Sequence, residues 1–227
     1  MVSASAYLGV GLYTPAEAAR FIRAKPEALS RWVHGDAKGD SVFPAHFVGD
    51  TDKTITFIDM IQALAVRAVR TQQRRIPLGR IRDAVTRIIN EQQITSPLAH
   101  KHWLFAFGDT IVIKLSQEEI IGVSRGDVGQ AMMVPIVEPF LTEISFSETG
   151  LAEVWEPLKA GDYSVRLDPK IRFGQPTIHP LGLLADALAQ AVSSEGSVEA
   201  AAEAFNVPTA AVWLAAKYQD SLTGLTN

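Results

Sequence analysis

The run YSVRLDPKIRFGQPTIH, residues 163–179, says more than any other stretch about how this chain folds. It joins an Asp-Pro pair to a Phe-Gly-x-Pro turn and leads through an apolar isoleucine into a helical pattern. The run SVEAAAEAFNVP, residues 197–208, follows, and its Asn-Val-Pro triplet separates two apolar segments of helical period. The pattern predicts three helices, at 180–192, 197–205 and 208–218. We therefore expect a three-helix, helix-turn-helix-like domain over residues 161–227.

These residues resemble a small helix-turn-helix family that is often encoded beside PIN-type ribonuclease toxins. Members of that family are regarded as antitoxins. The resemblance covers about residues 163–220. It implies a VapB-type antitoxin whose partner is a PIN-domain ribonuclease toxin, and it points to a regulator instead of an enzyme.

The start of the chain predicts two short helices. Thr14 and Pro15 form an N-cap followed by a first-turn proline, and Pro26 opens a second helix that ends near Gly35. The apolar positions of each helix fall on one face. These inward positions are Ala18, Ala19 and Ile22 in the first helix and Leu29, Trp32 and Val33 in the second. A β-hairpin is expected over residues 42–57, and further helices over residues 57–70 and 76–90.

This arrangement resembles the DNA-binding domain of MerR-type regulators. The matching runs are YTPAEAA at 13–19, LSRW at 29–32 and IPLGRIR at 76–82. The resemblance implies a winged helix-turn-helix domain over residues 1–95. MerR regulators continue into a long dimerising helix, whereas Thr-Ser-Pro at 95–97 stops the pattern here. Their dimer geometry is therefore not carried over.

A middle α+β segment is expected over residues 96–160. The runs 103–107 and 110–114 are β-like, and the Gly-Asp pair between them is a strong hairpin signal. Residues 126–140 suggest a helix interrupted by two prolines, and 141–146 and 151–155 suggest two more strands. The predicted fold class is mainly α with small β elements (α+β).

Charge is distributed unevenly along the 227 residues. The chain carries a net charge of −4 and no cysteine. Residues 1–102 contain 14 Lys and Arg against 9 Asp and Glu, whereas residues 103–227 contain 7 against 16. One reading is that the basic half faces a polyanion, and the other is chance segregation on solvated surfaces. The absence of an apolar run of about 18 residues predicts no membrane span and a cytoplasmic protein.

Two groups of residues are candidates for DNA contact. In a helix-turn-helix domain, the second helix enters the major groove, where Arg can bridge guanine O6 and N7. The alternative is a three-helix core whose polar face meets only solvent. The predicted reading residues are Ser30, Arg31 and His34, and the predicted phosphate contacts are Arg70, Arg74, Arg75 and Arg80.

Motifs for catalysis and for metal binding are weak. Ser124 lies in a Gly-x-Ser-x-Gly pattern, and Asp162 or Asp168 followed by His179 would complete the order of an α/β hydrolase. The upstream sequence lacks the βα units that such a fold needs. His100 and His102 have a spacing found in some zinc sites but lack a third ligand nearby. We therefore expect no catalytic residues, no metal and no cofactor.

Residues 180–227 contain one basic side chain, Lys217, against five acidic ones. Such a surface repels phosphates, so this segment is expected to contact protein, either a second copy or the toxin. The leading hypothesis is an antitoxin that represses its own operon as a homodimer by binding operator DNA. One alternative is a transcription regulator with a small-molecule pocket. That pocket would be lined by Trp103, Phe105, Met132 and Met133. The other alternative is a protein-interaction scaffold.

Overall fold

The structure is a computed structural model. It describes residues 9–37, 39–47, 53–70, 77–101, 103–107, 110–114, 120–122, 134–135 and 143–223. Side chains are described outside residues 102–142, with the exception of Gln92. None of the described helices is both long enough and apolar enough to cross a membrane.

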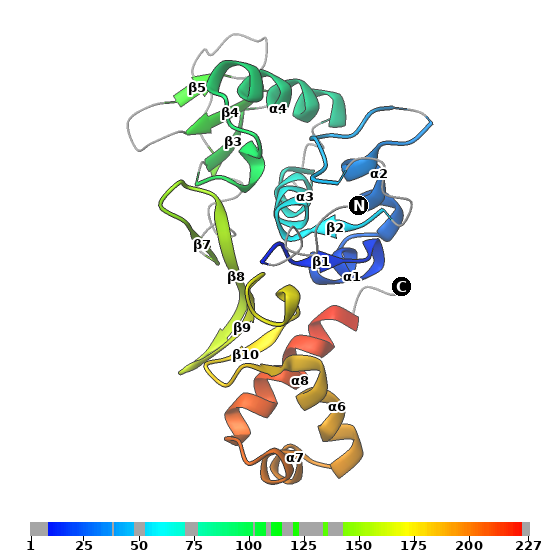
Figure 1. Cartoon of the computed structure of the whole chain (residues 1–227), viewed down its shortest axis with the longest axis vertical. Helices are drawn as coiled ribbons and strands as arrows, with labels where there is room; N and C mark the ends of the chain where they lie inside the picture. Colours follow the sequence, from blue (N-terminus) through cyan, green and yellow to red (C-terminus); the bar gives the residue numbers. More distant parts are fainter. Residues whose placement is uncertain are drawn as a thin grey trace. The chain divides into compact units, whose positions relative to one another are not determined.

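The chain divides into two compact units (Figure 1). One unit comprises residues 13–152, and the other comprises residues 1–12 and 153–227. We call them the central unit and the terminal unit. The mixture of helices and sheets in both agrees with the predicted α+β class.

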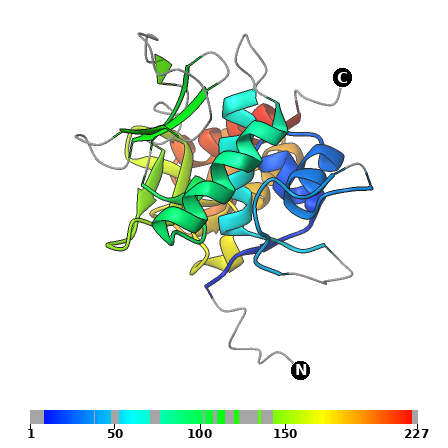
Figure 2. The same cartoon turned by 90° about the horizontal axis from the view of Figure 1, so that it is seen from above.

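The central unit begins with two short helices, α1 (Pro15–Phe21) and α2 (Pro26–His34). They are blue in Figure 2 and lie side by side. Thr14 caps α1 as predicted: its hydroxyl accepts from the Glu17 N–H at 3.2 Å, and the Thr14 N–H donates to the Glu17 carboxylate at 2.8 Å. This reciprocal capping box fixes the first residue of α1.

The core of the central unit is built on α3 (Phe57–Arg70), which is buried along most of its length. Strand β2 (Ile55–Thr56) runs directly into α3 and pairs with β1 (Leu12–Tyr13). Helix α1 packs on α2, and α2 packs on α3; the inward apolar side chains of α1 and α2 are almost fully removed from water. Each fully buried Leu, Ile, Val, Phe or Met side chain contributes about 1.5–3 kcal/mol, and an alanine contributes less. The central core residues are Ala18, Ile22, Leu29, Val33, Phe57, Met60 and Ile61.

The second half of the central unit combines a helix with a small sheet. Helix α4 (Leu78–Gln92) packs against β4, and the 3-10 helix η2 (Pro97–Ala99) covers part of α3. Strands β3 (Trp103–Phe107) and β4 (Thr110–Lys114) are antiparallel, with Phe107 opposite Thr110, as the hairpin prediction requires. The sheet has the order β5-β4-β3-β6, where β5 is Ile120–Gly122 and β6 is Val134–Pro135.

The terminal unit contains most of a five-stranded antiparallel sheet of order β11-β10-β9-β8-β7. Its strands are β7 (Ile144–Phe146), β8 (Ala152–Ala160), β9 (Tyr163–Leu167), β10 (Thr177–His179) and β11 (Leu183–Leu184). Trp155 is opposite Leu167, and the register then shifts before Leu158 meets Val165. Apolar side chains of these strands, such as Val165 and Ile178, are fully buried beneath the helices.

Glu156 on β8 is the centre of a polar cluster. Its carboxylate accepts from the Ser164 hydroxyl at 2.6 Å and pairs with Lys159 at 2.7 Å and Arg166 at 3.2 Å. The Glu156 side chain is 11% exposed. Burial alone would raise its pKa, but the hydrogen bonds and cations outweigh burial and lower the pKa of Glu156 to about 2.

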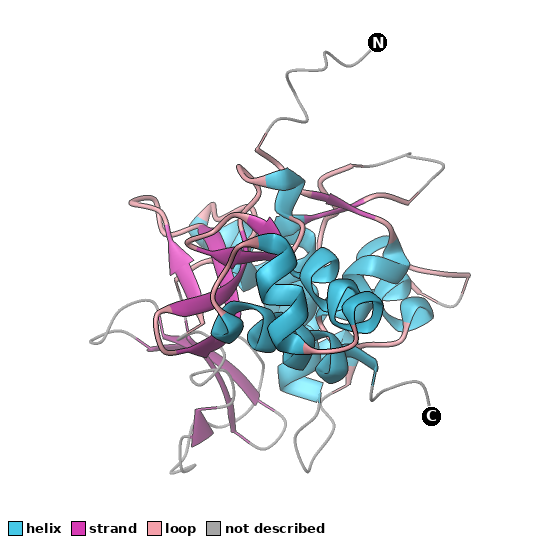
Figure 3. Ribbon diagram, turned by 90° about the horizontal axis from the view of Figure 1, so that it is seen from below, coloured by secondary structure: helices cyan, strands magenta, loops and turns pink. Residues whose placement is uncertain are grey.

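Three helices complete the terminal unit: α6 (Ala185–Glu195), α7 (Val198–Phe205) and α8 (Thr209–Thr223). They gather on one side of the sheet in Figure 3, and α8 packs on β9 and β10. The predicted break at 206–208 is present, with Asn206 in the left-handed region at φ 50°. Ser197 caps α7 by accepting from the Ala200 N–H at 3.0 Å.

Three predictions about local structure were wrong. The hairpin over residues 42–57 is absent from the described part of that segment, because Val42 bonds to Trp32 O and β2 pairs with β1. Residues 134–135, predicted as helix, form the edge strand β6, where a proline is tolerated. Helix α6 begins at residue 185 instead of 180, because the preceding residues form the β10–β11 pair.

Candidate nucleic-acid interface

The turn between α1 and α2 is short and carries a cation. Arg23 occupies the left-handed region at φ 53°, a conformation that a non-glycine residue adopts rarely. The turn is fixed by a hydrogen bond from Ala24 N–H to Ala19 O at 2.8 Å. The Arg23 side chain is exposed. The α1–α2 connection therefore carries an exposed guanidinium group.

The outward face of α2 carries the predicted reading residues. Positions three and four apart lie on one face of a helix, which groups Glu27, Ser30, Arg31 and His34. Glu27 and Arg31 are exposed, whereas Ser30 and His34 are half-buried. His34 Nε2 lies 3.2 Å from Lys53 O, which ties its ring to the segment before β2. Arg31 is thus the predicted reading residue with the freest approach to a ligand.

The loop after α2 is held at both ends. Gly35 has φ 74°, and a Cβ there would come within 2.9 Å of Gly39 O and Ser41 N, so the turn needs glycine. Val42 N–H donates to Trp32 O at 2.7 Å.

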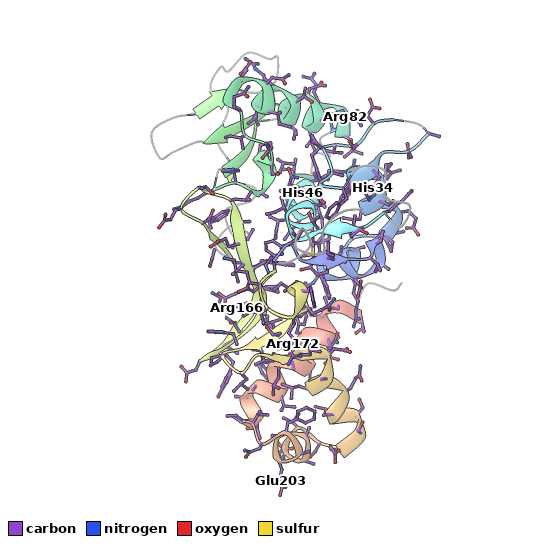
Figure 4. The ribbon with its side chains drawn as sticks, viewed as in Figure 1. His34, His46, Arg82, Arg166, Arg172 and Glu203 are labelled. Carbon is purple, nitrogen blue, oxygen red and sulfur yellow. The ribbon has the colours of Figure 1, made fainter. Side chains whose placement is uncertain are left out.

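Arg82 clamps this loop from α4. Its Nε donates to Ser41 O at 2.8 Å, and its guanidinium also donates to Asp40 O. Figure 4 shows Arg82 at the start of α4, and His34 on α2. In the sequence, Arg82 looks like part of a basic surface. In the structure, its guanidinium donates hydrogen bonds that position the loop after α2.

A buried carboxylate, that of Asp59, lies in the first turn of α3. Asp59 is fully buried and accepts from the Thr56 hydroxyl at 2.7 Å and from the His46 N–H at 3.3 Å. Its carboxylate also lies 3.9 Å from His46 Nδ1. Burial raises the pKa of Asp59, and the hydrogen bonds and His46 oppose that rise. Asp59 thus fixes both the first turn of α3 and the segment containing His46.

Two arginines lie near each other beside the α1–α2 turn. Burial lowers the pKa of Arg67 on α3, and the charge of Arg23 lowers it further. Like charges held in proximity favour a bound anion, because an anion relieves their repulsion. Arg23 and Arg67 are thus candidate phosphate contacts. Sequence reasoning missed Arg23, although a cation in the predicted turn could have drawn attention to it.

The structure describes two of the four predicted phosphate contacts. Arg70 is half-buried at the end of α3, and Arg80 is half-buried in the first turn of α4. Arg74 and Arg75 lie outside the described residues. These assignments remain predictions.

The described residues provide little support for the metal, hydrolase and small-molecule sites considered in the sequence analysis. No group of three or more His, Cys, Asp or Glu side chains in the described part of the chain is placed to hold a metal ion. His102, Ser124, Met132 and Met133 lie outside the described residues, as do the side chains of Trp103 and Phe105. The hydrolase pattern and the small-molecule pocket therefore remain as they stood in the sequence.

Comparison with known proteins gives two similarities over most of the chain. No family model matches. The chain is 27% identical over 205 residues to "Putative antitoxin VapB45" of Mycobacterium tuberculosis, covering 79% of this chain and 82% of that protein. Its structure is similar to the crystal structure of Rv2018 from Mycobacterium tuberculosis, with a TM-score of 0.65 and 21% identity. That match covers 92% of this chain and 99% of the crystallised one, and it shows a shared fold.

Proposed function

We propose that this chain is a VapB-type antitoxin that acts in the cytoplasm, neutralises a PIN-domain ribonuclease and represses its own operon as a homodimer. The antitoxin part is supported by the similarity to a protein named as a VapB antitoxin, which extends over four-fifths of both chains. In this proposal the protein is a regulator that acts by binding instead of by catalysis.

One observation carries the DNA-binding part: exposed Arg31 lies on α2, the helix that follows the cationic α1–α2 connection. In a helix-turn-helix reader, α2 would enter the major groove and Arg31 would meet a base edge. Arg23 and Arg67 would neutralise backbone phosphates, because guanidinium groups match phosphate oxygens.

The DNA-binding part is tested with the full chain and fluorescent DNA from the region upstream of its own gene. We expect tighter binding to that DNA than to a shuffled sequence, and salt-dependent binding to both. Arg31→Ala should remove most of the preference. Lys217→Ala, which removes a cation from α8, is the matched control and should bind like wild type. Equal affinity of the wild-type chain for upstream and shuffled DNA would contradict the repressor proposal.

The antitoxin part is tested by co-production. A PIN-domain ribonuclease encoded beside this gene should arrest growth when produced alone, and the full chain should restore growth. Failure of the chain to restore growth or to co-purify with that ribonuclease would contradict this part, whatever the DNA result.

A further inference from the structure

The outward face of α2 carries a carboxylate beside its exposed arginine. Glu27 lies four positions before Arg31, so the two side chains share one face of the helix, and both are exposed. On α4, Arg87 and Glu91 have the same spacing and form an ion pair at 2.8 Å. Glu27 and Arg31 form no ion pair, with each other or with any other described residue. Both charged groups are therefore available to another molecule.

A carboxylate on a face that meets DNA weakens binding unless a base compensates it. Arg23 and Lys25, which are exposed just before α2, attract phosphates, whereas Glu27 repels them. An acidic residue in the first turn also stabilises its helix through the helix dipole, and Glu27 occupies that turn of α2. Any role of Glu27 in DNA binding has to be separated from this stabilisation.

Cytosine is the base whose major-groove edge fits a carboxylate. It presents the N4 amino group as a donor and no acceptor. Adenine presents its N6 donor beside the N7 acceptor, which would repel a carboxylate, and guanine and thymine present acceptors only. A glutamate that enters the major groove beside Arg31 would therefore select cytosine, while Arg31 selects guanine through O6 and N7.

We propose that Glu27 is a second specificity-determining residue, which reads a cytosine close to the guanine that Arg31 reads. Four helical residues span about 6 Å along the axis of α2. Successive bases of one strand are about 3.4 Å apart along the duplex, so the two bases lie no more than about two positions apart. The inference rests on the proposed DNA binding. It adds the sequence class of the operator, whose half-sites combine this cytosine and this guanine.

Selection of binding sites from random duplex DNA by the full chain tests the pair of bases. The wild-type chain should enrich sites that contain a cytosine and a guanine at a fixed spacing of about two positions or fewer. Glu27→Ala should retain the guanine and lose the cytosine. Arg31→Ala should retain the cytosine and lose the guanine.

Glu27→Gln gives the sharpest result, because an amide can hydrogen-bond to both N6 and N7 of adenine. The wild-type chain should bind the selected site about tenfold more tightly than the same site with adenine in place of the cytosine, and Glu27→Gln should reverse that preference. Removing the negative charge strengthens binding to every sequence, so the ratio of the two affinities is the quantity to measure. Glu199→Gln is the matched control, since Glu199 is also an exposed acid in the first turn of a helix, α7. It should leave the ratio unchanged.

Urea unfolding of both glutamine variants separates base reading from helix stabilisation. Similar losses of stability in the two variants, with a changed base preference only in Glu27→Gln, would support the inference. An unchanged preference for cytosine in Glu27→Gln would overturn it and leave Glu27 with the stabilisation of α2 alone. A wild-type chain that enriches no sequence would overturn the repressor proposal, and this inference would fall with it.

Discussion

The helices of the central unit and those of the terminal unit use a similar local device for opposite surfaces. Between α1 and α2, and between α7 and α8, a residue other than glycine takes the left-handed conformation: Arg23 at φ 53° and Asn206 at φ 50°. After the α1–α2 connection, α2 exposes Arg31. After the α7–α8 connection, α8 exposes Trp213. Backbone geometry alone therefore does not determine what each helical group binds, and the side chains on the outer face do.

The largest expected effect on stability comes from truncating one core leucine in the helices of each unit. The two truncations should also separate the roles of the two groups of helices. Leu29 and Leu214 are both fully buried. Leu29→Ala and Leu214→Ala should each cost about 2–5 kcal/mol of unfolding free energy, measured by urea denaturation. We expect Leu29→Ala to weaken DNA binding more than self-association, and Leu214→Ala to do the reverse. If both variants lose the two activities in the same proportion, the helical groups do not have separate roles.

Two arginines near the α1–α2 turn should differ in what they contribute to binding. Arg31→Ala should cost about 1–3 kcal/mol of discrimination between upstream and shuffled DNA, because a base contact is lost. Arg23→Ala should weaken both DNAs about equally and reduce the slope of log affinity against log salt by about one. Anisotropy titrations at several salt concentrations measure both quantities. An unchanged salt slope in Arg23→Ala would remove Arg23 from the phosphate contacts.

The polar cluster of the terminal unit gives a prediction on pH. The pKa of Glu156 is lowered to about 2 in the folded chain, below its ordinary value of 4.5. The unfolded chain therefore binds more protons between those values, and stability is lost as pH falls from about 4.5 towards 2. Glu156→Gln should lower the unfolding free energy at neutral pH by on the order of 1–3 kcal/mol and flatten the dependence in this acid range. Parallel stability curves for wild type and variant would contradict the assignment.

The contribution of Asp59 in the central unit to stability has the opposite dependence on pH, since burial raises its pKa in the folded chain. The folded chain then holds this proton longer than the unfolded chain. Stability should fall as pH rises from the ordinary value of 3.8 to the raised pKa, and the loss should persist above it. Unfolding of Glu156→Gln, in which the Glu156 contribution is absent, measures this slope with less interference.

The smallest expected effect compares the two N-caps. Thr14→Ala removes a capping box, whereas Ser197→Ala removes a single bond to Ala200 N–H. Each should cost about 0.5–2 kcal/mol, with Thr14→Ala at the higher end because Glu17 also loses the hydrogen bond from the Thr14 hydroxyl. Thermal unfolding of both variants measures the difference. A larger effect at Ser197 would show that the reciprocal bond at Thr14 adds little.

Elements with strong local signals were predictable from the sequence. The Thr14 cap, the proline starts of α1 and α2, and the apolar period of α3 are encoded within a few residues, and the structure confirms them. The β3–β4 hairpin is equally local. The pairing of β2 with β1 joins residues more than 40 positions apart, and no local pattern reports such a contact.

The candidate site was less predictable for a related reason. Arg82 and Arg80 look alike in the sequence, yet Arg82 binds carbonyl groups 41 and 42 residues away. Ser30 and His34 share the helical face of Arg31, but neighbouring segments half-cover both. The sequence identifies the face, and the tertiary structure decides which of its side chains can reach a ligand.

The covering of α3 by η2 has a consequence for dissecting this protein. Pro97, Leu98 and Ala99 are buried and pack on α3. A fragment that ends at residue 95 would therefore lack them and expose apolar surface of α3 to water. Residues 100 and 101 also hydrogen-bond to the segment at 150–151. A self-sufficient reading module would therefore have to extend to about residue 152. A shorter fragment that failed to bind DNA would report on a damaged core, not on the reading face.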